Sequence, residues 1–218
     1  MLSHEFVRNA LFAGTFVALA CGLVGYFVVL RRAVFAGDAL SHVAFTGALA
    51  AAAAGLDSRF GLFVGTLLAG ALLGAAGRSA EADDAAIGTA FVWILGLGVL
   101  LLATGAGGEI GVRTLFGGIF GVSSGEARLA ALLGLATALL LLMVARPLLF
   151  ASIDPRVAAA RGVPVRGLSV VFLALVGVVA AEATQVVGAL LLLGLLGEAV
   201  RDAHRLGEPH PRRSELLR

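Results

Sequence analysis

The feature that most constrains this chain is the stretch of residues 9–30, which contains no charged side chain. About 20 apolar residues in a helix cross the hydrocarbon core of a bilayer, and a helix satisfies its own backbone hydrogen bonds there. Similar stretches recur along the 218 residues. We therefore expect an all-α fold, a polytopic transmembrane helical bundle of about seven spans, at residues 9–30, 33–56, 60–77, 85–108, 129–145, 167–181 and 183–197.

The composition agrees with a membrane protein and argues against other classes. Hydrophobic residues make up 60% of the chain and charged residues only 14%, whereas a soluble domain carries about 25% charged residues. This excludes a soluble enzyme and a disordered protein. A formal net charge of +2 gives no basic surface for nucleic acid, so we expect no nucleic-acid partner. The single cysteine, Cys21, is expected to be a packing residue.

Arginine placement predicts how the spans are oriented. All 16 basic residues are arginine, and cytoplasmic segments of membrane proteins retain Arg and Lys. With seven spans and an outside N-terminus, twelve of the 16 fall inside and four outside. We therefore predict an outside N-terminus and an inside C-terminus in the plasma membrane. In residues 109–128 we expect a loop with a short interfacial or re-entrant helix, and if that stretch spans, everything after it inverts.

Asp38 and His42 are the strongest candidates for chemistry, because ionisable side chains within an apolar span are costly to bury. A spacing of four puts both on one helix face, with Cβ atoms about 5–6 Å apart. A carboxylate oxygen and an imidazole nitrogen suit a borderline divalent ion such as Zn²⁺, Mn²⁺ or Fe²⁺. Two ligands are too few for a closed site, so a second protomer, other helices or water would complete it. The alternative is a buried, hydrogen-bonded pair that only fixes helix packing.

A second candidate lies in the polar region of residues 146–166. Asp154 followed by Pro155 is typical of a helix N-cap and first helical position, and Gly162 is typical of a helix stop. We therefore predict a short exposed helix between two spans on the arginine-rich side. An ordinary interfacial helix explains these residues equally well.

The remaining ionisable residues carry weaker predictions. Glu182 separates the last two expected spans, so we expect it at the outer interface rather than as a buried proton or ion carrier. Residues 198–218 are polar, and their histidines are not spaced as ligands on one helix face. The chain has no catalytic motif and no lysine, so it cannot itself be a P-loop ATPase. Active transport would draw on an ion gradient or on a separate ATPase.

Several short motifs follow one another in a specific order. The most specific is an arginine pair at residues 31–32 followed by Gly37, Asp38 and His42. Shorter motifs lie at residues 84–88, 115–123, 154–163 and 185–188. In order and spacing they resemble the integral-membrane permease subunits of zinc/manganese/iron ABC importers, from about residue 6 to about residue 196. The resemblance implies a transmembrane permease domain at residues 1–197 and a cytoplasmic tail at residues 198–218.

The resemblance also implies roles and partners. Asp38 and His42 would coordinate the passing cation, and a cytoplasmic coupling helix that docks on the ATPase would include Asp154, Pro155, Ala160, Arg161 and Gly162. The partners would be a second permease copy, a cytoplasmic ATPase subunit that holds the ATP, and an extracytoplasmic metal-binding protein. The cargo would be Zn²⁺ or Mn²⁺, with no permanently bound cofactor.

The C-terminal end departs from the family pattern near Gly197, where family members continue with a Pro-containing, Ala-rich stretch and usually further helices. A short variant, a truncation and a frame change all remain open. The predicted function is the non-enzymatic permease subunit of an ATP-driven divalent-metal importer that works by alternating access. The alternatives are an ion-gradient-driven secondary transporter with Asp38, His42 or Glu182 as proton carriers, and a degenerate permease that does not transport.

Overall fold

The structure, a computed structural model, describes residues 5–76, 84–103 and 124–187, and its regular elements there are all helices. They are α1 (Glu5–Leu30), α2 (Val34–Ala53), α3 (Ser58–Ala76), α4 (Asp84–Ala103), α6 (Ser124–Ile153), α7 (Pro155–Ala160) and α8 (Val165–Val187). Five of them are long and apolar enough to cross a membrane, and the Gly88–Ala103 part of α4 adds a shorter apolar helix. The predicted all-α, polytopic bundle is confirmed.

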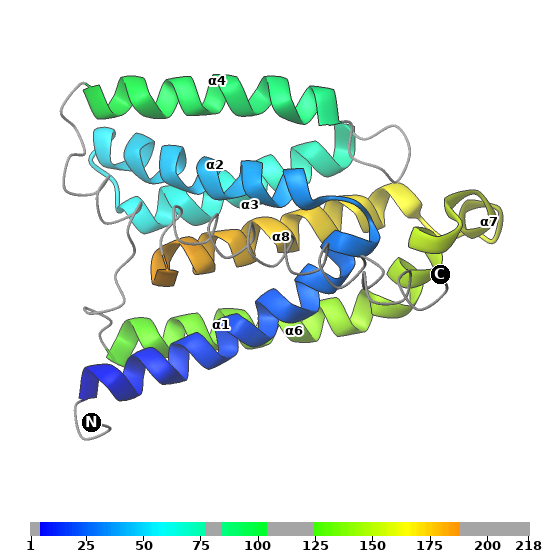
Figure 1. Cartoon of the computed structure of the whole chain (residues 1–218), viewed down its shortest axis with the longest axis horizontal. Helices are drawn as coiled ribbons and strands as arrows, with labels where there is room; N and C mark the ends of the chain where they lie inside the picture. Colours follow the sequence, from blue (N-terminus) through cyan, green and yellow to red (C-terminus); the bar gives the residue numbers. More distant parts are fainter. Residues whose placement is uncertain (1–4, 77–83, 104–123, 188–218) are drawn as a thin grey trace, which may run out of the picture.

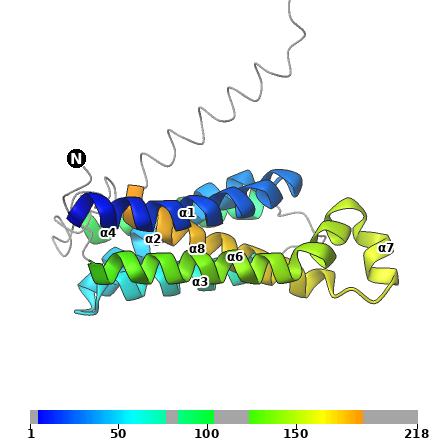
Figure 2. The same cartoon turned by 90° about the horizontal axis from the view of Figure 1, so that it is seen from below.

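The two middle helices of the bundle are α2 and α8 (Figure 1, Figure 2). α3 packs against both, α4 packs on α2, and α1 and α6 pack against each other and on α8. The buried core therefore includes Leu40 of α2 and Phe172 of α8, whereas Trp93 of α4 and Met143 of α6 are exposed. Large apolar side chains on the outside are what a bilayer, rather than water, accommodates.

Glycines let α3 and α8 approach closely. A Cβ on Gly74 would lie 2.5 Å from the Cα of Val170, and a Cβ on Gly177 would lie 2.5 Å from the carbonyl oxygen of Thr66. Real Cβ atoms do not tolerate such distances, so only glycine fits at this spacing. Small residues at a helix–helix contact are the usual means of tight association in membranes, where the lipid gives no hydrophobic driving force.

Residue pairs fix the direction of each helix. Phe35 lies beside Gly88 and Thr46 lies beside Gly98, so α4 runs parallel to α2. Figure 1 shows the same arrangement, with α3 running back between them in sequence. α4 therefore ends at the end of the bundle where α3 begins.

An ion pair places the start of α6 at that same end. Arg59, in the first turn of α3, pairs with Glu126, in the first turn of α6. Because α4 ends and α6 begins at the same end of the bundle, α6 and α8 run in the directions predicted for a segment 109–128 that does not span the membrane. Arg31 and Arg32, which directly follow α1, lie at the other end of the bundle, where Figure 1 shows α7. The same end holds four more arginines, towards the end of α6, in or beside α7 and in the first turn of α8: Arg146, Arg156, Arg161 and Arg166. We call this the arginine-rich end, and the end that holds Arg59 and Glu126 the opposite end.

Two predicted boundaries are wrong. The span expected at residues 129–145 belongs to α6, which continues past Pro147 to Ile153, because a transmembrane helix tolerates a proline when its neighbours re-satisfy the backbone. The separate spans expected on either side of Glu182 are one continuous helix up to Val187. Glutamate is a good helix former, and here its side chain is buried against other helices rather than exposed at an interface.

Some expectations lie outside the described residues. They are the loop and short helix expected in residues 109–123, the part of the last span at residues 188–197, and the tail at residues 198–218.

Candidate metal centre and docking helix

The link between α1 and α2 sets the position of the Asp38–His42 pair. Arg32 adopts a left-handed conformation with φ 55°. The N–H of Ala33 donates to the carbonyl of Val28 over 2.8 Å, and the N–H of Arg32 donates to that of Val29 over 3.1 Å. This pattern closes a helix C-terminus, so α1 ends sharply and α2 starts at Val34.

Arg31 anchors this turn to α8. Arg31 is only 7% exposed. Its Nη2 donates to the Oγ of Ser169 over 2.9 Å, and its guanidinium lies 5.2 Å from the centre of the Phe172 ring. Burial lowers the pKa of the Arg31 guanidinium, and the hydroxyl and the ring face replace part of its lost hydration. The sequence marked the arginine pair but not the different roles of its members. Only contacts distant in sequence reveal that Arg31 is buried while Arg32 is exposed.

Asp38 and His42 lie one turn apart on α2, with the Nε2 of His42 4.0 Å from the Oδ1 of Asp38. The two side chains are 27% and 15% exposed, respectively. At 4.0 Å the two atoms are too far apart for a hydrogen bond, which argues against the alternative of a hydrogen-bonded pair. The Oδ1 atom is buried and has no hydrogen-bond partner among the described residues.

The neighbouring helices hold the pair in place. The His42 ring meets the Phe91 ring of α4 edge-on, with centroids 5.1 Å apart. The Oγ of Ser41 donates to the backbone carbonyl of Asp38 over 2.7 Å. On the side of α8, a Cβ on Gly37 would meet Val176 at 3.8 Å, an ordinary van der Waals distance. The pair therefore lies on a helix that is packed against both α4 and α8.

The chemistry of the pair fits a divalent ion that it shares with other ligands. Two ligands of a tetrahedral ion with bonds of about 2.1 Å lie roughly 3.4 Å apart, so a small rotation of either side chain brings Asp38 and His42 into range. Within the described ranges, no cluster of three or more His, Cys, Asp or Glu side chains occurs. One copy of the chain thus offers two ligands here.

The predicted short helix is present as α7 and projects at the arginine-rich end (Figure 1). The Oδ1 of Asp154 accepts from the N–H groups of Arg156 and Val157, both over 3.0 Å, and Pro155 occupies the first turn. Gly162 closes the helix with φ +82°, a conformation that glycine adopts without strain. The cap, the proline and the stop are therefore as the sequence predicts.

α7 is anchored at one side and exposed at the other. Ala158 is buried, whereas Arg156, Val157, Ala160 and Arg161 are exposed. The guanidinium of Arg161 lies 6.0 Å from the centre of the Phe150 ring of α6. A helix of this length is not stable alone, so its connections to α6 and α8 hold it in place.

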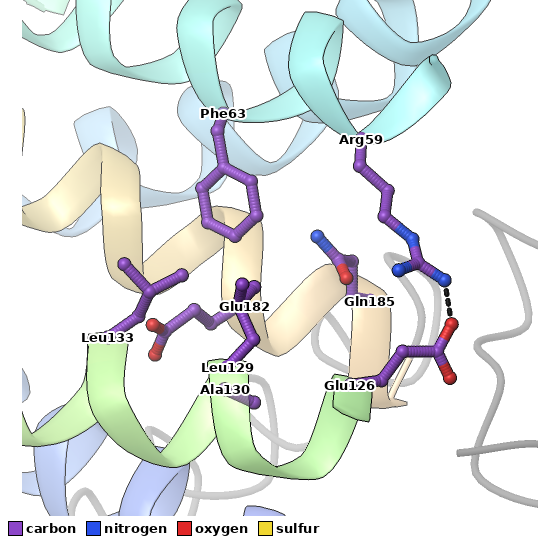
Figure 3. A pocket seen from close by; sticks show the side chains of 8 residues that line it. All are labelled: Arg59, Phe63, Glu126, Leu129, Ala130, Leu133, Glu182 and Gln185. Carbon is purple, nitrogen blue, oxygen red and sulfur yellow. Dashed lines mark ion pairs between the residues drawn. The ribbon is translucent and has the colours of Figure 1, made fainter. Parts of the chain in front are cut away.

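A third polar site was not predicted. Glu182 is 2% exposed and lines a pocket between α3, α6 and α8, together with Gln185 and the Arg59–Glu126 pair (Figure 3). The expectation that Glu182 lies at an interface is wrong, because α8 continues through it. The sequence signal that could have indicated this site was an acidic residue within an apolar stretch. The burial of the Glu182 side chain results from the packing of α6 against α8.

Comparison with known proteins identifies relatives over most of the chain. The sequence model of the ABC 3 transport family matches residues 3–208. The chain is 29% identical to the manganese transport system membrane protein MntC of Halalkalibacterium halodurans, over 90% of this chain and 68% of that protein. It is 31% identical to the manganese import system permease protein ScaB of Streptococcus parasanguinis, over 88% of this chain and 69% of that protein.

A solved structure shares the fold. It is PsaBC from Streptococcus pneumoniae in complex with Fab, to which the chain is 31% identical with a TM-score of 0.74. The match covers 89% of this chain and 70% of that chain.

Proposed function

The chain belongs to the ABC 3 transport family, and on this premise we propose that it is the permease of a divalent-metal importer driven by a separate ATPase. It is a multi-pass protein of the plasma membrane. The observation that carries the proposal is the pair of metal-ligating side chains, Asp38 and His42, one turn apart on a central helix. An ionisable pair inside a membrane span is costly and indicates a pathway for ions.

We propose Mn²⁺ as the principal cargo, with Zn²⁺ as the competing ion. The relatives named above are called manganese transport proteins, and a carboxylate with an imidazole accepts both metals. A second permease copy would contribute its own Asp38 and His42, which would raise the number of ligands from two to four. The partial exposure of both side chains leaves them accessible to such a partner.

α7 is the proposed docking helix for the ATPase, with Asp154, Pro155, Ala160, Arg161 and Gly162 forming it or its ends. The contacts provide a route from this helix to the metal pair. α7 is followed directly by α8, Ser169 of α8 holds Arg31, and α2 begins three residues after Arg31. A displacement of α7 when the ATPase closes on ATP would therefore move the start of α2, which is the basis of the alternating-access mechanism that we propose.

The test is to co-express the chain with a candidate partner ATPase, to reconstitute both in proteoliposomes, and to measure which energy source drives uptake. We expect the ATPase to co-purify and ⁵⁴Mn²⁺ uptake to require ATP. Deletion of residues 154–163 should abolish both, whereas Asp57→Asn, at the opposite end of the bundle, should abolish neither. Uptake driven by a proton gradient without any ATPase would favour a secondary transporter. Stable insertion with neither uptake nor ATPase binding would favour a degenerate permease.

A further inference from the structure

Glu182 is a buried acid that the proposed transport mechanism does not use. It lies in α8 and is 2% exposed, and neither of its carboxyl oxygens has a hydrogen-bond partner among the described residues. Its Oε2 faces the backbone of α6, where a Cβ on Gly134 would lie 3.5 Å away. The carboxyl group is therefore packed into the contact between α8 and α6.

The groups around Glu182 come from every neighbouring helix, and the one cation among the described residues there has another partner. Arg59 of α3 lines the same pocket but pairs with Glu126 of α6. α1 contributes Cys21, which is close enough to Glu182 for an electrostatic interaction. α2 faces this part of α8 with alanines. Gln185, on α8 itself, lines the pocket with an Nε2 donor that has no partner among the described residues.

An ionised carboxylate at such a position would be a desolvated charge without a counter-ion in the described part of the chain, which is among the costliest arrangements in a membrane protein. A neutral carboxylic acid avoids that cost and supplies an O–H donor as well as an acceptor. We propose that Glu182 is a proton-binding site and that its carboxyl carries a proton in this arrangement of the helices.

The pocket fits a proton better than a metal ion. Its volume of about 20 Å³ is enough for roughly one water molecule. Figure 3 shows Gln185 between the Glu182 carboxyl, which lies beside Leu133, and the Arg59–Glu126 pair. A water in the pocket would have the Glu182 carboxyl and the Gln185 amide among its polar neighbours. The carboxylate of Glu126 is already paired with Arg59, which leaves Glu182 as the one unpaired acid among the described lining residues. The described residues also offer no cluster of three metal-ligating side chains here.

Proton binding at Glu182 would couple pH to the contact between α6 and α8. When the proton leaves, an unpaired charge remains between the two helices, so the arrangement weakens as the pH rises. The pocket includes Arg59 and Glu126, which lie at the opposite end of the bundle. This site is separate from Asp38 and His42 and does not depend on what the chain transports.

Infrared spectroscopy tests the site directly on the full chain with its co-purified ATPase in nanodiscs. The C=O stretch of a protonated carboxylic acid, which shifts in D₂O, should be present at neutral pH in the wild type and in Asp57→Asn. It should be lost in Glu182→Gln, which keeps the shape of the neutral acid. Titration of the wild type to high pH should abolish the same band, so that the result does not depend on the variant folding.

Two outcomes would overturn the proposal. One is the absence of a carboxylic-acid band that depends on Glu182 at neutral pH. The other is the loss of that band when MnCl₂ is added to the Asp38→Ala/His42→Ala double variant, because a metal ion would then occupy the pocket in place of the proton. Persistence of the band in that double variant supports the proton site.

Discussion

The guanidinium of Arg31 donates a hydrogen bond to the hydroxyl of Ser169 over 2.9 Å, and this contact joins the turn before α2 to the first turns of α8. The two residues are 138 positions apart in sequence. Phe172, one turn further along α8, presents its ring to the same guanidinium. The helix that carries the metal-ligating pair is thereby tied to the helix that leads from α7.

Removal of the Arg31 side chain should destabilise this junction. A hydrogen bond to a charged group contributes about 1.5–3 kcal/mol and a desolvated cation–π contact about 2 kcal/mol, so Arg31→Ala should cost about 3.5–5 kcal/mol. Arg32→Ala, at an exposed neighbour, should cost far less. Unfolding in detergent measures both, and a double-mutant cycle with Ser169→Ala isolates the pair. An Arg31→Ala variant as stable as Arg32→Ala would contradict this role.

The tight contact between α3 and α8 should not tolerate an added methyl group. Gly177→Ala brings a Cβ to 2.5 Å from a backbone oxygen of α3, and such overpacking costs about 1–3 kcal/mol. Gly96→Ala on α4 is the matched control, because its Cβ would meet nothing within 4 Å. Thermal unfolding of the two variants should separate them clearly. Equal melting temperatures would mean that the helices are not in close contact.

The N-cap of α7 should be needed for ATPase docking. Asp154→Ala removes the acceptor for two backbone N–H groups, a loss worth about 1 kcal/mol, which is large for so short a helix. Co-purification of the ATPase should fall, and Asp154→Asn, which retains a capping oxygen, should restore it. If both variants retain the ATPase equally, the cap has no part in docking.

Uptake should fall as the medium becomes acidic. Asp38 and His42 must both be deprotonated to bind a metal, so protons compete with the ion. The measurement is the rate of ATP-dependent ⁵⁴Mn²⁺ uptake across a pH series, with the ATPase activity of the complex followed in parallel. Uptake that falls while ATP hydrolysis continues would support competition at the pair. A rate independent of pH would be evidence against these ligands.

Local rules were sufficient to predict several parts of this molecule. Apolar stretches predicted the positions of α1 to α4, because crossing a bilayer needs a minimum apolar length. Asp154, Pro155 and Gly162 predicted α7 with its ends, because capping depends on residues adjacent in sequence.

What could not be predicted depends on contacts between distant segments. Glu182 separates two apolar stretches in the sequence, yet α8 continues through it, with a glycine of α6 beside the carboxyl. The burial of Arg31 depends on Ser169 and Phe172, which no local pattern connects to it. The i, i+4 spacing placed Asp38 and His42 on one face, but the 4.0 Å separation came only from the structure.

The central claim is that Asp38 and His42 hold the transported ion. The most direct test is ATP-dependent ⁵⁴Mn²⁺ uptake by Asp38→Ala in proteoliposomes, compared with wild type and with the exposed-acid control Asp57→Asn. Membrane insertion and ATPase binding are to be matched between samples. We expect uptake by Asp38→Ala to fall to background, with insertion, ATPase binding and the Asp57→Asn rate unchanged. Uptake by Asp38→Ala at the wild-type rate would contradict the account.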